Sequence, residues 1–193
     1  TILEEQCFRY EYDGRGRLVM KKIPGADVAY LVYDARNRLV MTQDPALRPQ
    51  GQWMVNRYDA FNRLTEAGLW VNAGSFASHL QAADTSITYP AVTGSYEAMI
   101  IRHYDDYNDR PATLSSFQPA PETYFAAADN SHWPYPQHPA PATAVKGMMT
   151  WSSTRIIGTA EWIHSVSYYD EKDRVIQNQS TNITGGTDIT ALQ

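Results

Sequence analysis

The sequence of 193 residues contains a single cysteine, Cys7, and no long apolar run. One thiol cannot close a disulfide within the chain, so packing must hold the fold together. No stretch of about 18 consecutive apolar residues is present, which excludes a transmembrane helix in this sequence. The chain begins with Thr1 and has no basic segment followed by an apolar core, the pattern of a secretory leader. These features are typical of an excised fragment or a processed product.

Positive charge is also scarce. The chain has 16 basic against 21 acidic side chains and a formal net charge of −5. Proteins that bind nucleic acid or anionic membranes concentrate lysine and arginine on one face. The charge balance therefore argues against both kinds of partner.

Recognisable catalytic and metal-binding motifs are missing. An EF-type Ca²⁺ loop that begins at Asp105 would need glycine at its sixth position and glutamate at its twelfth, where Arg110 and Ser116 stand. The sequence has no Gly-x-Ser-x-Gly elbow and no glycine-rich phosphate loop. The histidines are scattered and show no zinc-ligand spacing; they are His79, His103, His132, His138 and His164. We therefore expect no catalytic residue, no metal site and no cofactor.

Tyrosine, by contrast, is abundant, with 13 among the 193 residues. Hydrophobic residues make up 43% of the chain, enough to build the core of one ordinary domain or two small ones. Long runs of alanine, leucine, glutamate and lysine with helical spacing are missing. The composition therefore favours strands.

Tyr-Asp pairs recur along the chain and mark an internal repeat. The pairs are Tyr12-Asp13, Tyr33-Asp34, Tyr58-Asp59, Tyr104-Asp105 and Tyr169-Asp170. Successive pairs lie 21, 25, 46 and 65 residues apart. The last two intervals are close to two and three times a period of about 22 residues, as an array with eroded or inserted units would give.

The clear units share the form Tyr-Asp-x-x-Gly/Asn-Arg-Leu, and each predicts a β-hairpin. Gly16, Asn37 and Asn62 stand at the same offset, where glycine and then asparagine best tolerate a left-handed backbone. The aspartate is expected to accept hydrogen bonds from turn amides, and the arginine to lie towards the aspartate of its own or a neighbouring hairpin. The predicted structural motif comprises Tyr12, Asp13, Gly16, Arg17, Tyr33, Asp34, Asn37, Arg38, Tyr58, Asp59, Asn62, Arg63, Tyr104, Asp105, Tyr169, Asp170 and Arg174.

Two later units depart from this form. The unit at Tyr104 has one residue more before its arginine, and the unit at Tyr169 has Asp173 at the turn offset, so turns of another type are expected there. Residues 72–96 and 118–145 are predicted as irregular insertions between repeats, with a short helix at 77–83. The predicted fold is all-β: an antiparallel meander of successive β-hairpins that forms a twisted, curved sheet over a single repeat region, 1–193.

These units resemble the Rhs (YD-repeat) family, which includes bacterial Rhs proteins, shell-forming subunits of insecticidal toxin complexes and animal teneurins. The stretch Trp162–Gln177, followed by Gly185–Asp188, resembles Rhs-type proteins of Bacteroidetes in particular. The resemblance covers residues 8–70, 97–117 and 146–188. It implies a spiralling sheet of hairpins that, in full-length members, forms a hollow shell around the C-terminal part of the same polypeptide, often a toxin.

The resemblance thus implies a structural and non-catalytic segment, secreted or at the cell surface, whose partners are further repeats and an enclosed C-terminal domain. Many such proteins cleave themselves with aspartates in Asp-Pro-x-x-Gly contexts. Asp44-Pro45-Ala46-Leu47 lacks that glycine, so we expect no autoprotease. An excised segment would expose strand edges that the intact protein pairs, and edge-to-edge self-association is therefore expected.

Two other functions stay open at this point. A cell-surface carbohydrate-binding or adhesion module would use Trp133 and Tyr135 as an exposed aromatic platform for a glycan or peptide. A hydrolase built on the same sheet would need a cleft with at least two titratable groups of displaced pKa.

Overall fold

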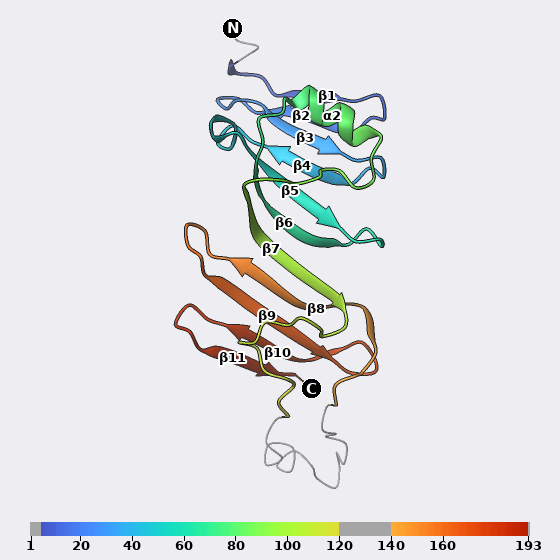
Figure 1. Cartoon of the computed structure of the whole chain (residues 1–193), viewed down its shortest axis with the longest axis vertical. Coiled ribbons are helices and arrows are strands. Elements are labelled where there is room, and N and C mark those ends of the chain that lie inside the picture. The colour runs from blue at the N-terminus through green and yellow to red at the C-terminus, as the bar shows by residue number, and fades with distance from the viewer. Residues whose placement is uncertain (1–4, 120–139, 193) are drawn as a thin grey trace. The chain divides into compact units, whose positions relative to one another are not determined.

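The fold is an open, all-β meander, which confirms the predicted class. The computed structural model describes residues 5–119 and 140–192. Its strands form one 11-stranded antiparallel sheet in which the spatial order is the order in the chain (Figure 1). The described strands are β1 (Arg9–Tyr12), β2 (Leu18–Lys22), β3 (Ala29–Tyr33), β4 (Leu39–Gln43), β5 (Gln52–Tyr58), β6 (Leu64–Val71), β7 (Tyr96–Asp105), β8 (Val145–Arg155), β9 (Trp162–Tyr169), β10 (Val175–Thr181) and β11 (Thr187–Ala191).

The chain divides into two compact units, Thr1–Met99 and Ile100–Gln193, here called unit 1 and unit 2. Strand β7 contributes its first residues to unit 1 and the rest to unit 2. Each unit has a hydrophobic core of its own.

The core of unit 1 lies between one face of its strands and helix α2 (Phe76–Asp84). Period-two alternation places Trp53 of β5 opposite Trp70 of β6 on that face. The helix packs on β3 (Figure 1). Its Phe76 ring stacks on Tyr30 with 4.3 Å between the ring centroids. The side chain of Ser75 caps the helix by accepting a hydrogen bond from the Ser78 amide. The helix predicted at 77–83 is thus confirmed.

The core of unit 2 is covered by the extended segment that follows β7. Two glutamines of β10 hold this segment: Gln177 exchanges hydrogen bonds with the backbone of Gln118, and Gln179 donates to the Ser116 carbonyl at 3.0 Å. Both glutamine side chains are buried, and these bonds satisfy much of their hydrogen-bonding capacity. The residues packed there include Leu114, Trp151, Val166, Tyr168 and Ile176.

The long intervals between Tyr-Asp pairs arise from insertions. From Tyr33 to Tyr58 the chain passes through two strands, β4 and β5. From Tyr58 to Tyr104 it again passes through two strands, β6 and β7, although the interval in sequence is longer. The extra length of that step lies in the connection that contains α2. The next step, to Tyr169, passes through β8 and β9, and its extra length lies in the connection between β7 and β8. Insertion therefore explains the spacing in the described residues.

Strands β1 and β11 form the two edges of the described sheet, and the residues of both are exposed. Exposed backbone edges can pair with another strand, and edge-to-edge self-association stays a prediction. No helix within the described residues has the length and apolar character needed to cross a bilayer.

Candidate functional site

Four of the five Tyr-Asp units end in the same hairpin turn. The third residue after the aspartate has a left-handed backbone. Its φ is 74° at Gly16, 63° at Asn37, 66° at Asn62 and 61° at Asp173. Its amide donates to the aspartate carbonyl at 3.0 to 3.1 Å in every case. The predicted left-handed offset is confirmed, and Asp173 shows that the unit at Tyr169 keeps the common turn, so the expectation of another turn type there was wrong.

The aspartate carboxylate holds each of these turns. In the second unit, Asp34 Oδ1 accepts the amides of Arg36 and Arg38, both at 2.9 Å, and Oδ2 accepts Arg38 Nε at 2.7 Å. The same three bonds recur at the other three aspartates, with distances between 2.6 and 2.9 Å; these aspartates are Asp13, Asp59 and Asp170. The expected amide cap and the arginine contact therefore occur together within one turn.

These contacts keep Asp13, Asp59 and Asp170 ionised. Burial raises the pKa of the Asp13 and Asp59 carboxyls, but hydrogen bonds from the following arginine outweigh it and leave both pKa values lowered. At Asp170, hydrogen bonds from Arg174 lower the pKa to about 2. Ionised carboxylates that are fully engaged in this way act as structural groups and not as general acids.

Two of these arginines, Arg17 and Arg38, also reach the next turn along the sheet. Arg17 Nη1 donates to the carbonyl of Asp34 and to Asn37 Oδ1, both at 3.0 Å, and its guanidinium lies 5.4 Å from the centre of the Tyr33 ring. Arg38 repeats the arrangement in the following unit, with Asn62 Oδ1 at 3.3 Å and the Tyr58 ring at 5.1 Å. The arginine of one unit thus binds the tyrosine and asparagine of the next, an arrangement here called the arginine relay.

The arginine relay joins the first three units, and the repeat side chains nearest the two edges of the described sheet are exposed. Tyr12, in the first unit, is 62% exposed, and no arginine of the described residues lies over its ring. In the last unit, the side chain of Arg174 is 68% exposed, and within the described residues it binds its own turn alone. By contrast, the side chains of Arg17 and Arg38 are each 12% exposed.

A β-bulge accompanies the turn in the same four units. The register shifts by one residue between each tyrosine and the residue before it, so that the second residue after the arginine is left over on the return strand. These left-over residues are Val19, Val40, Thr65 and Ile176. A bulge at a fixed position bends each hairpin and increases its local twist. No motif in the sequence indicates the bulge separately from the turn.

The unit at Tyr104 differs, as predicted. Asp105 has φ of 76° and binds the amide of Gly147 at 2.7 Å, far along the chain. Asp106 takes the capping position, with the Asn108 amide at 2.8 Å and His103 Nε2 at 2.7 Å. No group of three or more His, Cys, Asp or Glu side chains that could hold a metal ion occurs in the described residues.

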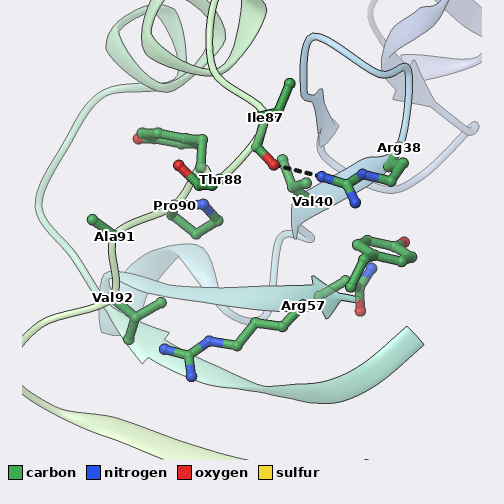
Figure 2. Close-up of a pocket in the computed structure, with 11 residues that line it drawn as sticks. Arg38, Val40, Arg57, Ile87, Thr88, Pro90, Ala91 and Val92 are labelled. Carbon is green, nitrogen blue, oxygen red and sulfur yellow. Dashed lines mark hydrogen bonds between the residues drawn. The ribbon is translucent and has the colours of Figure 1, made fainter. Parts of the chain in front are cut away.

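In unit 1 the insertion 72–96 is fastened to the repeat arginines. Asp84 Oδ1, at the end of α2, lies 3.1 Å from Arg17 Nη2 and 3.3 Å from Arg15 Nη2. Beyond the helix, the Ile87 carbonyl accepts Arg38 Nη2 at 2.6 Å (Figure 2). The repeat arginines therefore join neighbouring turns and also position the insertion.

A cavity of about 440 Å³ lies where this insertion passes over β4 and β5. Figure 2 shows the 87–92 segment on one side, with Arg38 and Arg57 reaching towards the cavity from the sheet. Burial raises the pKa of its two tyrosines, Tyr58 and Tyr89, so both keep their protons at neutral pH. The described residues that line the cavity include no carboxylate.

Behind the cavity, His79 of α2 is 3% exposed. Its Nδ1 lies 2.6 Å from the Tyr89 hydroxyl, and its ring meets Trp53 edge to face with centroids 4.7 Å apart. Burial lowers the pKa of His79. In the sequence His79 was one of five scattered histidines, but its spacing of three and four residues from Phe76 and Ala83 places it on the buried face of the helix.

We expect acid to destabilise unit 1 through His79. Unfolded histidine titrates near pH 6.5, so as the pH falls below about 6.5 the unfolded state takes up the proton first and the free energy of unfolding declines. Denaturant unfolding at pH 7.5 and pH 5.5, followed by hydrogen exchange of β5 and β6, measures this. The variant His79→Phe should lack the decline. An equal decline in the variant would contradict the assignment to His79, because the turn carboxylates titrate at lower pH.

The other aromatic and histidine residues singled out in the sequence lie outside the residues that the structure describes. Trp133 and Tyr135, the predicted aromatic platform, and His132 and His138 lie in residues 120–139, beyond the described ranges. No family model matches the chain, and no curated protein matches it.

Proposed function

We propose that the chain is a non-catalytic wall segment of a longer Rhs-type repeat protein, secreted or at the cell surface, that encloses a C-terminal domain of the same polypeptide. The observation that carries this proposal is the open arginine relay. Within the described sheet, the second unit both receives an arginine and donates one, whereas Tyr12 is 62% exposed and the Arg174 side chain is 68% exposed. The exposed Tyr12 ring could receive an arginine from a further unit, and the exposed Arg174 could reach a tyrosine of another. Each is one half of the contact that repeats between neighbouring units, as in repeat proteins whose units contact only their neighbours.

The open edges support the same proposal. Strands β1 and β11 carry unpaired backbone groups that further hairpins would satisfy. Arginine holds the carboxylates of Asp13, Asp59 and Asp170 in the ionised form, and the described residues that line the cavity at β4 and β5 include no carboxylate. These features favour a role in enclosure over one in catalysis.

The structure of the natural polypeptide that contains this sequence tests the proposal. We expect a Tyr-Asp hairpin on each side, with an incoming arginine over Tyr12 and an incoming tyrosine ring against Arg174, and a C-terminal domain that resists protease until the wall is opened. Unrelated folds joined directly to β1 and β11 would overturn the proposal. The adhesion alternative predicts instead that Trp133→Ala abolishes binding on a glycan array.

A further inference from the structure

Unit 2 contains a cavity of about 420 Å³ between the β8–β9 turn and the β10–β11 turn. We propose that it binds a neutral saccharide of one or two rings. The volume lies in the range of small-ligand sites. The inference is independent of the wall function, because none of the residues that line this cavity belongs to the Tyr-Asp motif.

Both rims of the cavity are held by their own hydrogen bonds. In the β8–β9 turn, the Ile156 amide donates to the Glu161 carbonyl at 2.9 Å. In the β10–β11 turn, Asn182 Oδ1 accepts the Gly186 amide at 2.9 Å and the Thr184 hydroxyl at 2.7 Å. Because these hydrogen bonds already order the two turns, binding a ligand would cost little additional conformational entropy.

Trp162 supplies an aromatic wall to the cavity. Its side chain is half-buried at the start of β9, and the Arg155 guanidinium lies 5.8 Å from the ring centre. An indole ring offers a large, rigid apolar face, which suits the C–H face of a pyranose. Ile163 and Ile183 extend the apolar lining on either side.

Three polar groups in the lining are available to a ligand. Glu161 is exposed, and its carboxylate has no hydrogen-bond or ion-pair partner within the described residues. His164 binds Ser153 Oγ through Nδ1 at 2.7 Å, which leaves Nε2 without a partner in the same residues, and burial lowers its pKa so that the ring stays neutral. The Thr187 hydroxyl also lines the cavity. Together they offer an acceptor carboxylate, a neutral imidazole and a hydroxyl.

This combination favours a neutral polyol over charged ligands. The Glu161 carboxylate repels anions, and the Arg155 guanidinium against Trp162 repels a cation that would stack on the ring. An apolar ligand would leave the carboxylate desolvated and unpaired. Vicinal hydroxyls of a sugar can donate to the carboxylate while the ring carbons cover the indole, so they satisfy both features at once.

The test is binding of glucose, galactose, mannose, N-acetylglucosamine and their β-linked disaccharides to this chain, measured by saturation-transfer NMR and calorimetry. We expect at least one sugar to saturate, with contacts to the Trp162 ring. Glu161→Gln should weaken that sugar about 10-fold, since it removes a charged acceptor at an exposed position and leaves the fold intact. Trp162→Ala should abolish binding.

The matched control is Phe61→Ala, which removes an aromatic ring that is 76% exposed in a turn of unit 1. It should leave sugar binding unchanged. Saturation by none of these sugars would overturn the proposal, and so would equal affinity of Glu161→Gln and the unaltered chain. If Trp162→Ala does not fold, the Glu161→Gln comparison still decides, because Glu161 makes no side-chain contact that the fold requires.

Discussion

Replacing Asp34 by alanine is expected to lower the free energy of unfolding of unit 1 by about 3–5 kcal/mol. The Asp34 side chain is fully buried and lies 2.6 Å from Arg38 Nη2. Its removal leaves the Arg38 guanidinium, itself only 12% exposed, without its counter-charge, and two turn amides without an acceptor. An uncompensated buried charge costs far more than the net value of the pair it came from.

The effect should extend beyond the turn, because Arg38 also holds neighbouring structure. Its Nη2 donates to the Ile87 carbonyl, and its guanidinium lies over the Tyr58 ring. We therefore expect hydrogen exchange to increase in β3, β4 and the 86–92 segment together. Guanidinium denaturation with exchange detected by mass spectrometry measures both the loss of stability and its extent.

Asp59→Ala is the matched control for Asp34→Ala. Asp59 makes the same contacts with the two turn amides and with Arg63 Nε, but the Asp59 and Arg63 side chains are 21% and 22% exposed. Water can replace part of the lost hydrogen bonds, so we expect a smaller cost of about 1–2 kcal/mol. Equal losses in the two variants would show that burial of the charge is not the cause.

The sequence was sufficient to predict the sheet and its turns because both depend on local chemistry. Glycine, asparagine and aspartate are the residues most favoured at positive φ, and an aspartate three residues earlier can cap the turn through contacts within the turn itself. The same offset therefore identified Gly16, Asn37 and Asn62 without knowledge of the tertiary structure. The short helix in the first insertion followed from equally local signals.

The sequence predicted the contact of each arginine with an aspartate, but not its contacts with the tyrosine and asparagine of the next unit. The contact of each arginine with its own aspartate spans four residues, but the contact with the next turn spans about 20 residues and depends on how consecutive hairpins abut. The roles of Asp84, Gln177 and Gln179 were missed for a similar reason. A polar residue in a strand or at a helix end predicts exposure, and only the path of the insertion shows that these side chains bind it.

Gly68 is a position whose role becomes visible only in three dimensions. In the sequence it is an ordinary glycine within a strand, where it weakens the strand without an evident gain. In unit 1 it pairs with Val55 on one side, and on the other it faces the first residues of β7. The absence of a side chain lets the backbone and the Tyr96 ring approach closely.

Gly68→Ala is therefore expected to destabilise unit 1 by about 3 kcal/mol. The new Cβ would lie 2.4 Å from the Glu97 carbonyl oxygen and 2.6 Å from the Tyr96 hydroxyl. The tyrosine can rotate away, but the carbonyl belongs to the backbone of β7, so relief requires the two strands to separate. Denaturant unfolding and hydrogen exchange of β6 and β7 should both report the loss.

Gly14→Ala provides the control, since a Cβ there meets nothing within 4 Å and the backbone is not left-handed. Its effect should lie within about 0.5 kcal/mol of zero, as for surface substitutions in general. If Gly68→Ala were as stable as Gly14→Ala, the close approach of β7 to Gly68 would be contradicted. A loss confined to Gly68→Ala would instead establish that β6 must lack a side chain at this point for the first residues of β7 to pair with it.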